Sequence, residues 1–339
     1  MSMKKKSLML SLFLLLVLSM FTEISFADTT VYEAADTSDH SYYIEYENAP
    51  VKIANKYFLE ERKNKTSNIY VSDDIEKKGQ KIISIGPEKE LYSTLLTNGK
   101  KIFYAVRSWR KDGSVTSIYV VNVDGKSRKK LTTLKTKFAD VIPMAYYNGN
   151  LYLREDIHYA ETAYGLKAVR YNYIYTYNMR SGGVKKVTKK EIFPGTSEAV
   201  VFGRYIYMNT HEKYNPESLC ICAYDMKTGE LVKIAKGSFV DATVSNGNLY
   251  YSLPGKHGSE KVYCCSLSGK GRKKLIATLP EYSTIGKITH EKIYYSVSID
   301  ENWIYSEPQY RCYDIERNTT QQIEFDTYLK NVGDTAYWK

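Results

Sequence analysis

The sequence predicts an all-β fold built from repeated four-stranded antiparallel units, and three observations predict it. An aliphatic–aromatic pair recurs along the chain with steps of 45, 49, 55, 43, 44 and 43 residues, and such a period is typical of repeated supersecondary units. Asn-Gly dipeptides, the strongest short-range hairpin signal, precede several copies of the pair. Tyrosine contributes 33 of the 339 residues, and aromatic side chains favour strands.

The recurring aromatic residues, which we call the aromatic column, are Phe58, Phe103, Tyr152, Tyr207, Tyr250, Tyr294 and Tyr337. In the repeat over 240–279 the sequence predicts four strands, at 240–245, 248–253, 261–267 and 272–279. Apolar residues occupy both faces of the third strands, which is typical of a sheet packed between two neighbouring sheets. Sheets that pack in this way around an axis form a β-propeller, in which each four-stranded sheet is a blade.

The strand count predicts seven blades. From residue 50 onward the chain contains seven pairs of first and second strands but only six pairs of third and fourth strands. We expect the missing pair at 29–34 and 41–47, so that N- and C-terminal strands share one blade and close the ring without an open edge. About 45 residues per blade agrees with the repeat steps. Six blades is the alternative, and it leaves the last strand pair unexplained.

Residues 1–27 read as a secretory signal peptide. Lysines at 4–6 form a basic start, an apolar run follows, and Ala27 ends a Ser-Phe-Ala motif of the kind that signal peptidase cleaves. We expect cleavage after Ala27 and a single propeller domain over 28–339. No cysteine lies near this site to take a lipid, and no later segment is apolar enough to span a membrane. The sequence therefore predicts a secreted or cell-surface-associated protein.

The charge balance is basic, with a formal net charge of +10. Loss of the leader removes three lysines and one glutamate, which lowers this charge by two, to +8. A moderately basic exported protein suits anionic surroundings such as a cell-wall polymer, whereas export disfavours nucleic acid as a partner. We expect a monomer that binds an extracellular protein, a peptide or a cell-wall glycan.

Basic runs at 126–130, 185–190 and 272–274 have two interpretations. They can hold an anionic polymer, or they can protect outer strands from pairing with other chains. We favour the protective role, because the runs fall at the fourth strand of a repeat, which is the outer edge of its blade.

The five cysteines are Cys220, Cys222, Cys264, Cys265 and Cys312. All of them lie in apolar strand patterns, which indicates buried structural thiols. An odd number cannot pair completely within one chain, and one disulfide is the alternative in an oxidising environment. Their spacing matches no four-ligand zinc site.

The repeat that runs from Ile118-Tyr119 through Asp124-Gly125 to a basic run ending at Leu131 resembles the YWTD and TolB-like propellers. The resemblance covers nearly all of 50–339 and is greatest to exported bacterial members of unassigned function. The full Tyr-Trp-Thr-Asp signature does not occur, Tyr337-Trp338 being the nearest, and many relatives have six blades. The resemblance implies a binding or scaffold role more often than catalysis, and it carries no catalytic residues across.

In a propeller, the connections from second to third strands and from fourth to first strands lie on one face, and the tight hairpins lie on the other. Here the second-to-third connections are the long and variable ones, so we expect a ligand to bind on their side. Aromatic rings beside charged groups can stack on sugars or peptides. The candidate ligand-binding residues of these loops are Trp109, Arg110, His158, Tyr159, His211, Tyr214, His257 and Trp303.

Three of these residues, His158, His211 and His257, occupy equivalent loops of consecutive blades. With carboxylates such as Asp156 and Glu212 they are an alternative metal site. We nevertheless expect no metal and no other cofactor, because loops of neighbouring blades can point apart. No phosphate-binding loop, nucleophile elbow or His-Glu-x-x-His motif occurs, and no catalytic residue is predicted.

The sequence therefore favours a secreted, non-catalytic propeller that binds a cell-surface or extracellular partner, peptide or glycan, through its long-loop face. A propeller hydrolase or lyase that uses the loop histidines and carboxylates is one alternative. A structural module of a larger surface assembly is the other.

Overall fold

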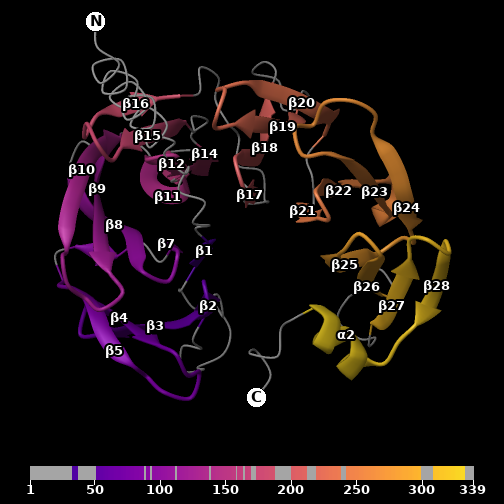
Figure 1. Ribbon diagram of the computed structural model, residues 1–339, viewed down its shortest axis with the longest axis horizontal. Helices are drawn as coiled ribbons and strands as arrows, with labels where there is room; N and C mark the ends of the chain where they lie inside the picture. The colour runs from indigo at the N-terminus through magenta and orange to yellow at the C-terminus, as the bar shows by residue number, and fades with distance from the viewer. Residues whose placement is uncertain are drawn as a thin grey trace, which may run out of the picture.

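The computed structural model describes residues 33–36, 51–87, 89–91, 94–110, 113–136, 139–157, 159–162, 165–168, 173–187, 200–211, 219–237, 242–298 and 308–332. These residues form seven antiparallel sheets, and six of them, each with four or more strands, follow one another around a central axis (Figure 1). Within each sheet the strand order follows the chain, so the fold is a β-propeller of six blades. The preferred prediction of seven blades is wrong, and the alternative of six describes this part of the chain.

The first three blades occupy the N-terminal half. Blade 1 contains β2 (Val51–Ile53), β3 (Lys56–Lys63), β4 (Thr66–Ser72) and β5 (Gln80–Ile85). Blade 2 contains β6 (Glu90–Leu91), β7 (Thr94–Thr97), β8 (Lys101–Arg110), β9 (Gly113–Asn122) and β10 (Lys129–Thr136). Blade 3 contains β11 (Ala139–Tyr147), β12 (Asn150–Ile157), β15 (Ile174–Asn178) and β16 (Val184–Lys186).

The other three blades occupy the C-terminal half of the chain. Blade 4 contains β17 (Val200–Phe202), β18 (Tyr205–His211), β19 (Leu219–Asp225) and β20 (Leu231–Lys236). Blade 5 contains β21 (Ala242–Ser245), β22 (Asn248–Pro254), β23 (Glu260–Ser266) and β24 (Lys274–Leu279), within two residues of the predicted bounds wherever these are described. Blade 6 contains β25 (Ser283–Ile288), β26 (Lys292–Val297), β27 (Gln309–Asp314) and β28 (Thr319–Gln322).

Two of the three Asn-Gly turns, those of blades 3 and 5, form as predicted, whereas at 98–99 only Gly99 has a positive φ. Asn148 and Asn246 have φ of 46°, and the glycine after each is also in the left-handed region, at 72° and 70°. Two consecutive left-handed residues give the hairpin twist that matches paired strands. These turns join first to second strands and set the register of blades 3 and 5.

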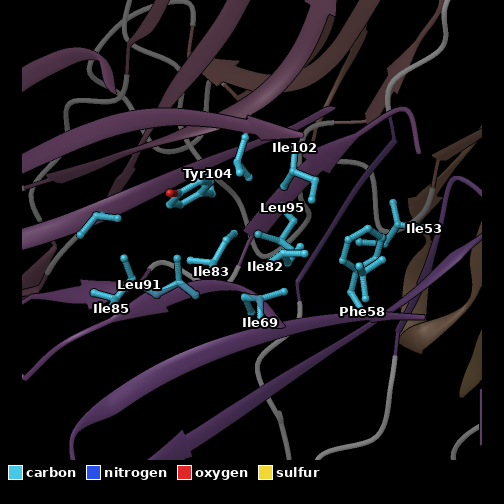
Figure 2. Packing of buried hydrophobic residues seen from close by; sticks show 13 residues of the cluster. Ile53, Phe58, Ile69, Ile82, Ile83, Ile85, Leu91, Leu95, Ile102 and Tyr104 are labelled. Carbon is cyan, nitrogen blue, oxygen red and sulfur yellow. The ribbon is translucent and has the colours of Figure 1, made fainter. Parts of the chain in front are cut away.

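The hydrophobic core is divided into five clusters, and each lies between two neighbouring blades. Figure 2 shows the cluster between blades 1 and 2, where Phe58 and Ile69 meet Leu95, Ile102 and Tyr104. All five residues are at most 1% exposed. The prediction that blades pack through apolar residues on both sides is therefore confirmed for the inner blades.

The aromatic column lies in these interfaces. The Tyr152 hydroxyl of blade 3 donates to the Met226 carbonyl oxygen of blade 4 at 3.0 Å, and the Tyr207 hydroxyl of blade 4 donates to the Leu267 carbonyl oxygen next to blade 5 at 2.8 Å. A buried hydroxyl needs such a partner. The column therefore joins neighbouring blades and is not a surface that grips a ligand.

Small residues pair with the column residues on the adjacent third strands. The partners of its six described members are Val71, Val120, Thr176, Ala223, Cys264 and Cys312. All five cysteines of the chain carry thiols outside any disulfide and are at least half-buried, and burial raises the pKa of Cys265 to about 11. The prediction of buried structural thiols is confirmed, because two of the cysteines fill a position that small side chains occupy in the other blades.

A helix stands where the seventh blade was expected. Residues 325–332 form α2 (Phe325–Val332), which has Asp326 in its first turn and Lys330 in its last turn, charges that suit the helix dipole. The Tyr310 ring of blade 6 lies 4.9 Å from the Phe325 ring and 4.7 Å from the Tyr328 ring. The helix therefore covers the side of blade 6 that a seventh blade would have covered. The last column residue, Tyr337, lies outside the described residues.

The opposite end of the ring of sheets, the outer side of blade 1, is polar. Glu61 accepts hydrogen bonds from the Tyr70 hydroxyl at 3.1 Å and from the Lys78 ammonium at 2.7 Å. The Ser84 hydroxyl donates to the Asn68 amide oxygen at 2.8 Å on the same side. Apart from Leu59 and the ring of Tyr70, such a face offers little apolar surface to bury against blade 6. In the described chain no strand pairing or apolar cluster joins these two blades.

The N-terminal strand does not close the ring either. The expected strand at 29–34 corresponds to β1 (Glu33–Asp36), and β1 pairs with β7 on the inner edge of blade 2. The prediction that N- and C-terminal strands share one blade is thus not met by the described residues. The second expected strand, 41–47, lies outside them. None of the helices in the described part is long and apolar enough to cross a membrane.

Candidate functional site

One face of the propeller collects the ends of all second strands. Each second strand runs from its tight turn to the opposite end of the blade, where the connection to the third strand begins. We call this side the long-loop face and the other side the turn face. The strands β8, β12, β18, β22 and β26 therefore bring the sequence-predicted connections to one side of the molecule.

Trp109 and Arg110 are the last residues of β8. They pair with Ser114 and Gly113 of β9, so that only residues 111 and 112 join the two strands. The expected long loop at 108–112 is wrong, because both segments continue the strand pattern to their ends. Blade 2 thus has, on the long-loop face, the end of a hairpin of two ten-residue strands instead of a long loop.

Tyr159 begins β13 (Tyr159–Thr162), which pairs with β14 (Gly165–Ala168). The register joins Tyr159 to Ala168. This two-stranded sheet, which we call the blade 3 arm, belongs to the connection between β12 and β15 and pairs with no other described strand. Its neighbour His158 lies outside the described residues.

Two more of the predicted residues lie on described elements of blades 4 and 5. His211 is the last residue of β18 and pairs with Leu219. His257 is the middle residue of the 3₁₀ helix η2 (Lys256–Gly258), whose turn is held by Ser259 donating from its backbone and hydroxyl to the Lys256 carbonyl oxygen. Two further residues, Tyr214 and Trp303, lie outside the described residues. The five residues placed by the backbone belong to four blades, and only Trp109 and Arg110 are adjacent.

A buried carboxylate marks the loop end of blade 3. Glu155 is 7% exposed, and its carboxylate accepts hydrogen bonds from the Tyr175 hydroxyl at 2.6 Å and from the Tyr173 N–H at 3.0 Å. Burial raises the pKa of Glu155, although both hydrogen bonds and the nearby Lys186 favour the charged form. Candidate selection from the sequence missed this residue. The signal was present, because Leu151, Leu153 and Glu155 share one face of the strand and a leucine would continue the pattern.

Two charges enter the interface between blades 2 and 3 from opposite sides. Phe103 and Leu153 belong to the cluster between these blades. Since strand side chains alternate between faces, Arg107 lies on the Phe103 side of β8 and Glu155 on the Leu153 side of β12. The apolar interface therefore ends, toward the long-loop face, in charged residues.

Blade 1 has a second buried carboxylate, which lies two residues after the column residue of its second strand, as Glu155 lies three residues after Tyr152. Glu60 is 1% exposed and accepts a hydrogen bond from the Arg62 guanidinium at 2.7 Å. These residues lie on the side of β3 that carries Phe58 and faces blade 2. A buried carboxylate needs such a cationic partner to remain charged.

The basic runs lie on outer strands. Lys129 and Lys130 belong to β10, Lys185 and Lys186 to β16, and Lys274 to β24, each the last strand of its sheet. All five are exposed. Their placement supports edge protection, since charged side chains on an outer strand oppose pairing with another chain.

The described residues contain no group of three histidine, cysteine, aspartate or glutamate side chains that could hold a metal ion. The alternative site of His158, His211 and His257 is not tested by this observation, because their side chains lie outside it.

Comparisons with known proteins come from structures alone. No family model matches the chain, and no curated protein matches its sequence. Among solved structures, the chain is similar to the acylaminoacyl peptidase of Pyrococcus horikoshii, with 15% identity, 82% of this chain and 44% of that chain covered, and a TM-score of 0.51. It is similar to the β-propeller domain of the trilobed protease from Pyrococcus furiosus, which has an open velcro topology, with 18% identity, 80% of each chain and a TM-score of 0.48.

A third similar structure is TolB from Acinetobacter baumannii, with 14% identity, 76% of this chain and 59% of that chain covered, and a TM-score of 0.39. The chain thus spans less than two thirds of TolB and less than half of the peptidase. At these identities the likeness concerns the fold alone. The propeller fold is therefore shown, with the peptidase at a TM-score of 0.51, and the TolB-like and YWTD parts of the sequence resemblance stay predictions.

Proposed function

We propose that the protein is an exported, non-catalytic propeller that binds a cell-surface or extracellular partner, peptide or glycan, through its long-loop face. The leader at 1–27 motivates the export, and the sequence resemblance to YWTD and TolB-like propellers, which implies binding more often than catalysis, motivates the binding role. The monomeric state belongs to the same proposal.

One observation carries the proposal. On the long-loop face, blades 2 and 3 extend into two hairpins, β8–β9 and the blade 3 arm, and the backbone places Trp109, Arg110 and Tyr159 on them. Aromatic residues beside an arginine suit stacking on a sugar ring or a peptide. Hairpins of paired strands also present side chains at fixed positions, which lowers the entropy lost on binding.

The test is retention of the full mature chain on purified cell walls and on a glycan array. Trp109→Ala should lower the affinity at least tenfold, on the scale of a removed aromatic contact at an interface. Phe202→Ala is the matched control, because Phe202 is an exposed ring, 45% accessible, beside the turn of β17 on the opposite face. This variant should bind as the original chain does.

Two outcomes overturn the proposal. One is equal binding by Trp109→Ala and the original chain on both probes. The other is binding that vanishes on raising the salt concentration and responds only to lysine substitutions on outer strands, since exposed charge contacts are screened by salt. Export is checked separately, by a mature N-terminus that follows Ala27.

A further inference from the structure

The blade 3 arm needs an anchor. A two-stranded hairpin alone is at best marginally stable in water, and β13 and β14 pair with no other described strand. Its position therefore depends on how its two ends leave the blade. The ladder between β12 and β15 ends at Arg154 and Ile174, so the connection that carries the arm begins and returns beside Glu155 and Tyr173.

Glu155 holds both sides of this base. Its own N–H donates to the Tyr173 carbonyl oxygen at 3.0 Å, and its carboxylate accepts the Tyr173 N–H at 3.0 Å. The same carboxylate accepts the Tyr175 hydroxyl at 2.6 Å. One residue of the outgoing strand thus binds two residues of the returning strand at three points, two at Tyr173 just beyond the last backbone pair and one at Tyr175 inside the ladder.

We propose that Glu155 is a positioning residue that clamps the base of the blade 3 arm, and that this arm contacts the partner on the long-loop face. The second half rests on the proposed function, whereas the clamp does not.

The clamp uses both oxygens of the Glu155 carboxyl group, which an amide does not offer. Two donors, the Tyr173 N–H and the Tyr175 hydroxyl, converge on these two separate oxygens. A glutamine has one acceptor oxygen, and the Tyr173 N–H can only donate to it, so the NH₂ group would face the Tyr175 hydroxyl. Glu155→Gln therefore replaces the contact between Tyr175 and a carboxylate by a weaker neutral one with little change of shape.

Glu60 provides a matched control. It is a buried carboxylate with a hydrogen-bonded partner, Arg62, like Glu155 in blade 3. In blade 1, however, β3 and β4 are joined only by the turn of Asn64 and Lys65, both with positive φ. Glu60→Gln thus perturbs a buried carboxylate at a strand end that carries no arm.

The clamp is tested by hydrogen exchange of the full mature chain without any ligand. Glu155→Gln and Tyr175→Phe should each speed exchange at residues 159–168 by roughly two- to tenfold, the effect of one weakened or lost hydrogen bond. The double variant should exchange little faster than Tyr175→Phe, because both changes act on the same contact. Glu60→Gln should leave 159–168 unchanged. Equal exchange in Glu155→Gln and the original chain, or equal acceleration by Glu60→Gln, overturns the clamp.

The contact role of the arm is tested by retention on purified cell walls. We expect Glu155→Gln to weaken retention severalfold and Glu60→Gln to leave it intact. If exchange accelerates but retention does not change, the arm does not contact the partner and the second half is overturned while the clamp stands. If the original chain binds neither cell walls nor the glycan array, the proposed function and the contact role fail together, and the exchange result still decides the clamp.

Discussion

At their turn ends the second strands of the six blades are alike, whereas at their loop ends they diverge. The turn end carries an aromatic column residue, which in blades 1 to 5 packs against the next blade, and a small residue pairs with it on the third strand. Two positions nearer the loop end, the same strands carry Glu60, Ala105, Arg154, Asn209, Ser252 and Ser296. Burial between two sheets restricts chemistry at the turn end, because a polar group there needs a partner. The loop end also contains buried polar groups, Glu60, Asn209 and Ser252, each with a partner, so it differs from the turn end in the variety of its side chains rather than in exposure.

The largest effect on stability should come from truncating a buried aromatic side chain of the column. Phe58 is fully buried in the cluster between blades 1 and 2. Phe58→Ala should therefore lower the free energy of unfolding by about 3–5 kcal/mol, the range for a truncated buried ring. Urea unfolding monitored by circular dichroism measures it. A loss below about 1 kcal/mol would show that the turn end is not the tightly packed region described above.

A smaller effect is expected from one column hydroxyl. Tyr207→Phe keeps the ring but removes the donor to the Leu267 carbonyl oxygen, so the free energy of unfolding should fall by about 1 kcal/mol. Tyr152→Phe should behave alike, since its hydroxyl makes the equivalent bond to Met226. Stability that is unchanged in both variants, measured in the same urea experiment, would limit the column to ring packing.

The small residue opposite the column gives a paired test. Cys312→Ala, which copies Ala223 of blade 4, should cost less than about 1.5 kcal/mol, whereas Cys312→Leu should cost about 1–3 kcal/mol through overpacking against Tyr294. Thermal unfolding ranks the two variants. The reverse order would refute the idea that small size decides this position.

At the loop end, stability should depend on pH through Glu155. Burial raises its pKa in the folded protein, so its contribution is complete below the unfolded pKa of about 4.5 and is lost as pH rises through the raised value. The stability difference between the original chain and Glu155→Gln should therefore shift against the original chain between acid and neutral pH. Urea midpoints at several pH values measure this. A difference independent of pH would place the pKa of Glu155 at its ordinary value.

Sequence reasoning succeeded where the same local rule recurs. The Asn-Gly turns, strand alternation and aromatic column place the strands of blade 5 within two residues, and they predict packing between sheets. It failed at 325–332, where Phe325, Tyr328, Leu329 and Val332 have the spacing of an amphipathic helix. The expected seventh repeat concealed this shorter pattern.

The described residues do not meet the prediction of a closed ring, and one reason for this is visible in the sequence. Glu61 in β3 and Asn68 and Tyr70 in β4 give the outer side of blade 1 a polar character, which a sheet buried on both faces does not have. For the candidate site, the sequence identified second-to-third connections but not their form. In blade 2, β8 and β9 either stay paired up to residues 110 and 113, as they do, or separate from residue 108 onward to form a loop. Which of the two occurs depends on cross-strand pairing, which is a long-range property.

A propeller with a helix over one end and a polar face at the other is, in its energetics, a bent linear array. The described blades share five apolar interfaces, so blades 1 and 6 each have one neighbour while the four between them have two. In such an array stability is close to a sum of unit and nearest-neighbour terms, and the units at the ends open first. A blade added or removed at an end changes the length of the array without breaking a contact between the first and last blades. The repeat number of such a chain is then free to vary one unit at a time.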